Sequence, residues 1–120
     1  MKHVLLIEDE GIIALQLSQT IESEGDYRVS IALNGREGLE VHEEDPADLV
    51  VTDLNMPELD GFGVIESVRA KTPAVKIIVL SGASQETERR AVEMGALCTL
   101  SKPVYSEDLL TAINDAFADL

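Results

Sequence analysis

The chain has 120 residues, of which 45% are hydrophobic and only 3% aromatic, and its 23 acidic against 9 basic residues give a formal net charge of -14. The length fits one domain over residues 1–120 with an aliphatic core. This negative charge repels nucleic-acid phosphates and anionic membranes. We therefore expect no direct nucleic-acid or membrane binding, and we expect cations and basic protein surfaces as partners.

The amino terminus and the cysteine content indicate a cytoplasmic protein. The apolar run after Met1 is too short for a signal peptide, and acidic residues follow it at once. No apolar stretch approaches the ~20 residues of a membrane-spanning helix. Cys98 is the only cysteine, so no internal disulfide forms, and its apolar neighbours predict a buried thiol.

The first expected elements are a strand, a helix and a second strand. The run Val4–Ile7 is apolar without polar alternation, which is typical of a strand buried on both faces. A helix is expected from Gly11 to Ser23, because apolar residues recur at four-residue spacing until Gly25 ends it. The second strand is expected over Val29–Ala32.

The middle of the chain repeats this order. Asn34, with Glu37 three residues later, resembles a capping box and opens a helix that runs to about Glu44. A third strand, again without polar alternation, is expected over Leu49–Thr52. Another helix starts near Gly61.

The last third of the chain contains two more strand–helix pairs. A strand is expected over Lys76–Leu80, followed by a helix from about Ser84 to Gly95. The fifth strand is expected over Ala96–Leu100 and the last helix from Ser106. Five alternations of strand and helix predict an α/β fold, with a doubly wound five-stranded parallel sheet and helices on both faces.

Four of the expected strands lead directly to polar residues. These are Glu8 and Asp9 after the first strand, Asp53 after the third, Ser81 after the fourth and Lys102 after the fifth. Each alone also fits a helix cap, a turn or a solvated side chain. Together they favour a site, because parallel sheets bind ligands beyond the carboxyl ends of their strands.

The chemistry of these side chains suits phosphoryl transfer. Converging carboxylates need a positive partner, and Mg2+ is commonly held by one or two carboxylates and phosphate oxygens. Lys102 offers a compact charge for a phosphoryl oxygen, and Ser81 offers a hydroxyl donor. A carboxylate such as Asp53 can act as the nucleophile.

The order and spacing of these motifs resemble the receiver domain of two-component response regulators, which are CheY-like phosphoproteins, over nearly the whole chain. The motifs that carry the resemblance are Glu8-Asp9, Asp53-Leu54-Asn55-Met56-Pro57, Asp60-Gly61, Ser81-Gly82 and Lys102-Pro103. The resemblance implies a flavodoxin/CheY-like sheet with strand order 2-1-3-4-5.

The resemblance also assigns roles to individual residues. Asp53 corresponds to the phospho-acceptor and also faces the metal. Asp9 corresponds to the residue that holds Mg2+ most directly, with Glu8 assisting and Asn55 contributing its backbone carbonyl. Ser81 corresponds to the switch hydroxyl.

The remaining matched residue and the partners follow from the same resemblance. Lys102 corresponds to the lysine that pairs with the phosphoryl group, and its bond to Pro103 is expected to be cis. The phosphoryl donor would be a histidine kinase or a histidine phosphotransfer protein. The chain would catalyse only its own phosphorylation and dephosphorylation. Its output face, the fourth helix, fifth strand and fifth helix, would control a downstream protein target or a fused output domain.

One position departs from the family pattern and keeps an alternative open. Many receivers carry Tyr or Phe three residues before the lysine, where this chain has Thr99, which cannot swing a ring. Thr99 is an ordinary strand residue or part of an altered switch. The alternative is a pseudo-receiver that docks proteins without phosphorylation.

An enzyme of the haloacid-dehalogenase type fits the sequence less well. That class carries a second Asp two residues after the nucleophile, where this chain has Asn55, and no capping domain fits this length. We expect His42 at the surface of an acidic helix and His3 in a structural role. Neither histidine is expected to accept a phosphoryl group or bind metal.

Overall fold

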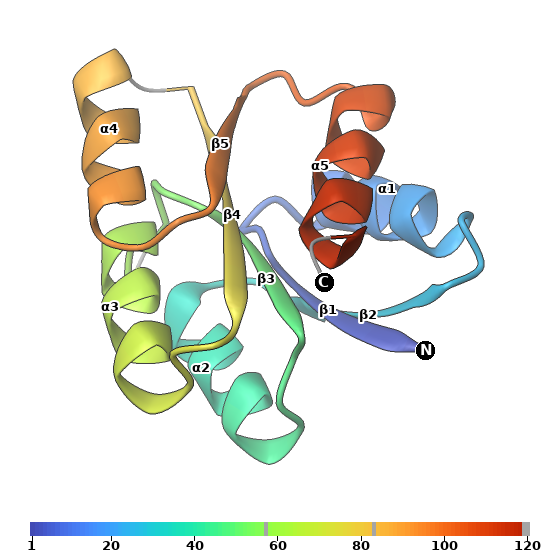
Figure 1. Cartoon of the computed structure of the whole chain (residues 1–120), viewed down its shortest axis with the longest axis horizontal. Helices are drawn as coiled ribbons and strands as arrows, with labels where there is room; N and C mark the ends of the chain where they lie inside the picture. The colour runs from blue at the N-terminus through green and yellow to red at the C-terminus, as the bar shows by residue number, and fades with distance from the viewer. Residues whose placement is uncertain (57, 83, 119–120) are drawn as a thin grey trace.

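The computed structural model describes residues 1–56, 58–82 and 84–118, and within them five parallel strands form one sheet in the order β2-β1-β3-β4-β5 (Figure 1). The strands are β1 (Lys2–Ile7), β2 (Tyr27–Ala32), β3 (Leu49–Asp53), β4 (Lys76–Ser81) and β5 (Cys98–Ser101). The helices are α1 (Gly11–Glu22), α2 (Gly35–Glu44), α3 (Gly61–Lys71), α4 (Gln85–Glu93) and α5 (Ser106–Ala118). The predicted α/β class and strand order are therefore confirmed.

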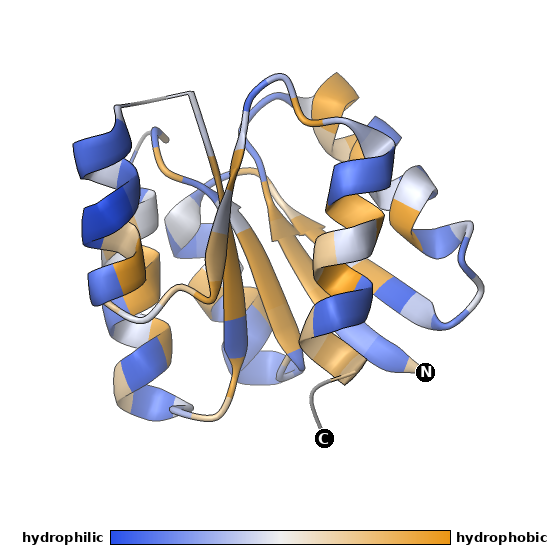
Figure 2. Cartoon of the chain, turned by 45° about the horizontal axis from the view of Figure 1, so that its top comes forward, coloured by the Kyte–Doolittle hydropathy of each residue, from blue (hydrophilic) through white to orange (hydrophobic). Residues whose placement is uncertain are grey.

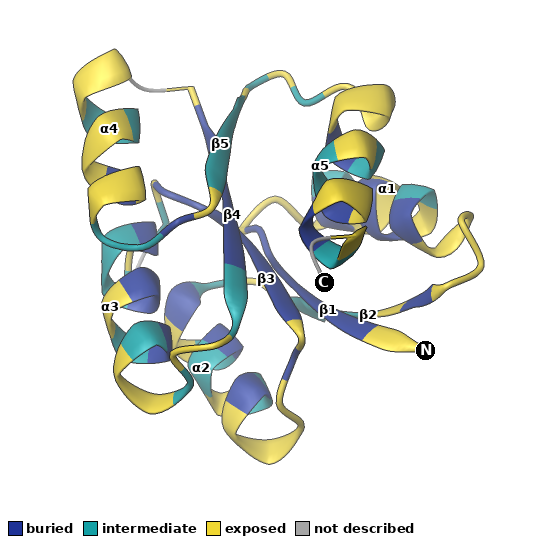
Figure 3. Ribbon diagram, in the orientation of Figure 1, coloured by how far each residue is buried: buried dark blue, intermediate teal, exposed yellow. Residues whose placement is uncertain are grey.

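The sheet separates two aliphatic cores, one on each face. Along β1, Val4 and Leu6 pack with α1 and α5, whereas Leu5 and Ile7 pack with α2, α3 and α4. Apolar residues fill the strands at the centre of the molecule, and the same strands are buried (Figures 2 and 3). All of β3 is buried, as its apolar start predicts, and the burial includes the polar Thr52 and Asp53 at its end.

Side-chain caps fix where several helices begin. The Asn34 side chain accepts a hydrogen bond from the Glu37 backbone N–H at 2.8 Å at the start of α2. Ser84 accepts one from the Thr87 N–H at 3.3 Å at the start of α4, and Asp60 caps α3 in the same way. Caps satisfy backbone donors that the first helical turn leaves unpaired. The predicted starts of these helices are therefore confirmed.

The prediction that His42 lies at the surface is wrong. Its side chain is buried, its Nε2 lies 2.9 Å from Thr72 Oγ1, and its Nδ1 accepts the Ala47 N–H at 3.0 Å. The acidic residues of α2 occupy the exposed side of the helix, and the local sequence does not show which side packs against α3. Cys98 also differs from its prediction, because it is half-buried.

His3 is buried at the start of β1, where its Nε2 lies 2.8 Å from Ser30 Oγ. This position suits the structural role that we expected. Across the described residues, every helix is too short or too polar to cross a bilayer.

Burial of His42 makes folding depend on pH. Burial, and then the neighbouring charge of His3, lower the pKa of His42 below its ordinary value of 6.5. The unfolded chain then binds a proton more readily than the folded one, so the free energy of unfolding falls as the pH drops below about 6.5. We predict that His42→Asn, which keeps an acceptor near Ala47, makes the free energy of unfolding depend less on pH. Urea unfolding at several pH values between 7 and 5 measures this dependence. Equal slopes in both proteins would contradict the assignment.

Candidate functional site

The carboxyl ends of four strands meet at one edge of the sheet, because all the strands are parallel. In register, Ile7 pairs with Thr52 and Asp53 pairs with Leu80, while Ser81 pairs with Ser101. The structure therefore brings together the polar residues that end or follow these strands, as the sequence predicts. They are Glu8, Asp9, Asp53, Ser81 and Lys102.

Lys102 lies between two buried carboxylates. Its Nζ donates to Asp53 Oδ2 at 2.6 Å and to Glu8 Oε1 at 3.3 Å. The Glu8 and Asp53 side chains are 0% and 6% exposed, whereas that of Lys102 is 30% exposed. A buried hydrogen bond to a charged group contributes about 1.5–3 kcal/mol, and solvent reduces this for the partly exposed Lys102. The bond between Lys102 and Pro103 is cis, as the resemblance implies.

Burial and charge act in opposite directions on these groups. Burial raises the pKa of Glu8 above its ordinary value of 4.5, although the Glu10 N–H and Lys102 act against this rise. Burial alone would lower the pKa of Lys102, but the hydrogen bonds and charges of Asp53 and Glu8 raise it overall. Lys102 therefore stays charged at neutral pH and holds the two acids together.

The site has fewer positive than negative groups. Glu8, Asp9 and Asp53 each offer a carboxylate oxygen, and these oxygens all lie within 4.8 Å of one another. One ammonium faces three carboxylates, which leaves repulsion that a cation would relieve. Mg2+ fits such a set, since it takes oxygen ligands and keeps several waters. Asp9 is exposed, which leaves that side of the cluster open to solvent.

Two predicted residues flank this cluster. Ser81 is buried at the end of β4, and the Lys102 backbone N–H donates to the Ser81 carbonyl at 3.0 Å. Asn55 is exposed, two residues after Asp53 on the loop that leaves β3. The role of its carbonyl as a metal ligand stays a prediction. Pro57 of the same loop motif lies outside the described residues.

The structure adds two contacts that sequence reasoning missed. Thr99 Oγ1 donates to Glu88 Oε1 at 3.4 Å, which links β5 to α4. A Cβ on Gly61 would lie 2.4 Å from the Asp53 carbonyl oxygen, so only glycine lets α3 approach the end of β3 this closely. The Asp60-Gly61 pair signalled a turn, but the sequence does not show what the turn packs against.

Comparisons with known proteins agree with the geometry. The family model of the response regulator receiver domain matches residues 4–114. A probable chemotaxis protein CheY from Rhizobium etli is 32% identical over 120 residues, which cover 98% of this chain and 93% of that protein. Transcriptional regulatory protein PdtaR from Mycobacterium tuberculosis is 32% identical over 112 residues, 93% of this chain and 55% of that protein. The chain thus spans nearly all of the first relative and about half of the second.

Solved structures give the same result. The crystal structure of a CheY-like response regulator receiver domain protein from Methanospirillum hungatei superposes with a TM-score of 0.93 at 31% sequence identity. The match covers 99% of this chain and 95% of the other. Its extent supports the predicted flavodoxin/CheY-like fold over all five strands and five helices of the described residues.

The crowded carboxylates predict that Glu8→Gln stabilises the metal-free protein at neutral pH. Gln has the same shape but removes one buried charge, and Lys102 keeps its 2.6 Å contact with Asp53. Thermal unfolding in a chelating buffer measures the effect as a higher melting temperature. The same variant should gain less stability from added Mg2+. Glu22→Gln, which changes an exposed acid on α1, serves as the control. A lower melting temperature for Glu8→Gln would contradict this account.

Proposed function

The chain belongs to the response regulator receiver domain family, and from this premise we propose that Asp53 accepts a phosphoryl group from a phosphohistidine donor. The donor is a histidine kinase or a histidine phosphotransfer protein. The observation that carries the proposal is the Lys102 ammonium 2.6 Å from Asp53 Oδ2, beside a cluster of three carboxylates. In this proposal residues 1–120 form one receiver domain.

The proposed transfer begins at a carboxylate oxygen of Asp53. That oxygen bonds to phosphorus, the bond from phosphorus to the donor imidazole nitrogen breaks, and that nitrogen takes up a proton. Lys102 leaves Asp53 and donates to a phosphoryl oxygen, and the Ser81 hydroxyl donates to another.

The proposed Mg2+ ligands are Asp9, Asp53, Glu8 through water, and the Asn55 carbonyl. When bound, Mg2+ neutralises charge that builds up between the carboxylates and the phosphoryl group. The fit rests on the three oxygens within 4.8 Å and on their excess negative charge. In the proposed dephosphorylation, a water oxygen bonds to phosphorus, the bond from phosphorus to the Asp53 oxygen breaks, and inorganic phosphate and a proton leave the restored carboxylate. The chain acts on no other substrate.

We further propose that phosphorylation changes the face formed by α4, β5 and α5. Ser81 lies at the end of β4, next to β5, and would move toward the phosphoryl group. The Thr99–Glu88 hydrogen bond then offers a route from β5 to α4 in place of an aromatic ring. The negative charge of the phosphoryl group would favour one of two arrangements of this face. The favoured arrangement would then control a downstream protein or a fused output domain.

Thr99 also favours a second candidate, a pseudo-receiver that docks proteins without phosphorylation. Without an aromatic ring at this position, the usual relay from the site to the surface is missing. The complete set of acids and Lys102 supports phosphorylation instead. Labelling of Asp53 separates the two candidates.

We predict that acetyl phosphate adds one phosphoryl group to the wild type only when Mg2+ is present, and adds none to Asp53→Asn. Intact mass spectrometry measures both, and circular dichroism checks that the variant is folded. The exposed Asp26, just before β2, supplies the control Asp26→Asn, which should be labelled like the wild type. Labelling that persists in Asp53→Asn would overturn the acceptor assignment.

We predict that Lys102→Ala still binds Mg2+ but responds less to phosphorylation. Lys102 donates to the carboxylates and supplies no oxygen ligand, so its removal deletes none of the proposed metal-binding oxygens, and bound Mg2+ would itself offset the repulsion that Lys102 relieves. Calorimetric titration measures Mg2+ binding, and amide chemical shifts of α4, β5 and α5 with beryllofluoride measure the response. Lys71→Ala, an exposed lysine on α3, is the control. Loss of all Mg2+ binding would contradict this division of roles.

A further inference from the structure

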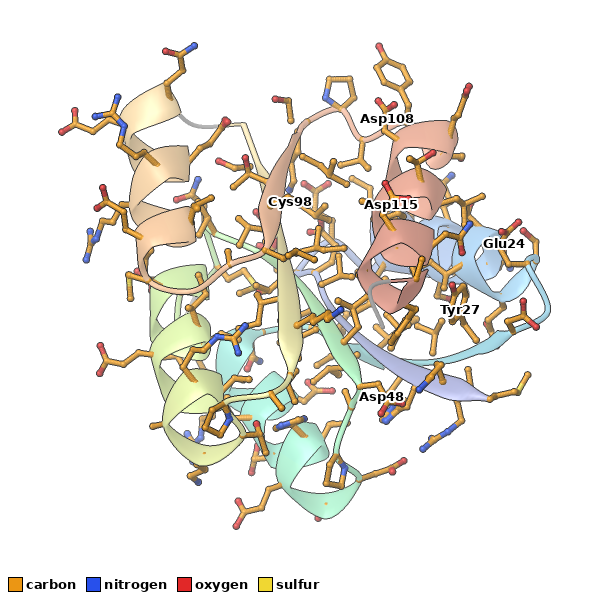
Figure 4. All side chains as sticks on the ribbon, in the orientation of Figure 1. Glu24, Tyr27, Asp48, Cys98, Asp108 and Asp115 are labelled. Carbon is orange, nitrogen blue, oxygen red and sulfur yellow. The ribbon has the colours of Figure 1, made fainter. Side chains whose placement is uncertain are left out.

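A groove of about 480 Å³ lies between the edge strand β5 and helix α5. Cys98 marks its β5 side, and Asp108 and Asp115 lie on α5 opposite (Figure 4). Most of its lining is apolar, from Leu97, Cys98 and Leu100 on one side and Ala112 and Ala116 on the other. Leu97 is 49% exposed beside these apolar residues, so its side chain extends the apolar lining to the surface.

The rim of this β5–α5 groove is negatively charged. Glu107, Asp108 and Asp115 line it and are exposed. Among the described residues that line the groove, the only cationic side chain is that of Lys76, whose ammonium donates to the Ala116 carbonyl in the last turn of α5. Three carboxylates around an apolar floor therefore offer charge complementarity to a basic, aliphatic ligand.

The strand beside the groove favours an extended ligand. In the sheet order β2-β1-β3-β4-β5, β5 pairs only with β4, so its outer side has no strand partner among the described residues. Edge strands with free backbone groups pair readily with extended segments, whose alternate side chains point to opposite sides. An extended segment that lies along the groove can thus turn one set of side chains, the aliphatic ones, to the apolar floor. The long lysine or arginine side chains of the other set can bend back to the carboxylates of the rim.

We propose that the β5–α5 groove binds an extended segment of a partner protein in which lysine or arginine alternates with aliphatic residues. A second copy of this chain is disfavoured, because it would bring the same acidic rim and a further charge of -14. The groove lies on the proposed output face, and this is the one respect in which binding here rests on the proposed function. The new element is the chemistry of the partner segment, which is basic and aliphatic.

Cys98 provides the readout, since it is the single cysteine, is half-buried and lines the groove. N-ethylmaleimide is neutral and is not repelled by the rim, so its rate of addition to Cys98, followed by intact mass, reports access to the groove. The probe is an acetylated, amidated peptide of alternating lysine and leucine. At a peptide concentration about tenfold above Kd, about nine-tenths of the protein is bound, and we expect the alkylation rate to fall about tenfold. Peptides of lysine with serine, and of glutamate with leucine, should protect far less.

Matched variants distinguish binding of the peptide in this groove from non-specific attraction of a basic peptide to an acidic protein. Asp115→Lys should weaken the peptide about threefold to tenfold, as removal and reversal of a rim charge do. Glu66→Lys makes the same charge change at an exposed position on α3 and should leave the affinity unchanged. Leu97→Ser should weaken the peptide by removing apolar contact. Each alkylation rate is compared with and without peptide in the same variant. This is necessary because burial, and then the charge of Asp115, raise the pKa of the Cys98 thiol.

Three outcomes would overturn the proposal. These are no protection by the lysine–leucine peptide, equal protection by the lysine–serine peptide, and equal weakening by Asp115→Lys and Glu66→Lys. Slower alkylation of Cys98 at higher protein concentration, without any peptide, would also overturn it. That result would show that a second copy of the chain covers the groove.

The experiment is run with and without Mg2+ and beryllofluoride, beside the Asp53 labelling assay. Peptide binding in either state supports the groove, even if Asp53 is never labelled and the proposed function fails. Absence of binding in both states, with Asp53 labelled normally, overturns the groove and leaves the proposed function standing.

Discussion

The Lys102 ammonium, held between the Asp53 and Glu8 carboxylates, is the contact on which the rest of the site depends. Two acids at 0% and 6% side-chain exposure would repel each other if nothing positive lay between them. Lys102 makes their proximity possible but leaves the cluster short of positive charge once Asp9 is included. This excess of negative charge supports the proposal that the site binds a cation. In the proposed transfer, Lys102 would exchange a carboxylate oxygen for a phosphoryl oxygen.

The fold serves this arrangement through two physical constraints. Parallel strands bring their carboxyl ends to one edge, so residues 94 positions apart, Glu8 and Lys102, lie 3.3 Å from each other. Two aliphatic cores, one on each face, hold those strand ends in register. The close approach of Gly61 to the Asp53 carbonyl then fixes where the loop after β3 runs.

Much of this was predictable because the signals are local. Uninterrupted apolar runs mark β1, β3 and β4, Asn34 and Ser84 mark helix starts, and the site residues follow directly from strand ends. β1 and β2 begin two residues earlier than expected, at Lys2 and Tyr27, because pairing with a neighbouring strand continues past the apolar run.

The features that the sequence did not show depend on how distant elements pack. His42 is buried, and its ring bonds to Thr72 and Ala47, which lie 30 and 5 positions away in the chain. Thr99 pairs with Glu88 only because α4 folds back on β5. The β5–α5 groove likewise arises from the spacing of two elements, since neither one alone contains a hollow surface.

The most direct test of the account is a crystal structure of the protein with Mg2+ and beryllofluoride. We predict that beryllium bonds to a carboxylate oxygen of Asp53, that the metal contacts Asp9, and that Lys102 Nζ donates to fluorine instead of Asp53 Oδ2. A structure in which Asp53 stays unmodified at saturating beryllofluoride, with Lys102 still at the carboxylates, would contradict the claim that this site is built to receive a phosphoryl group.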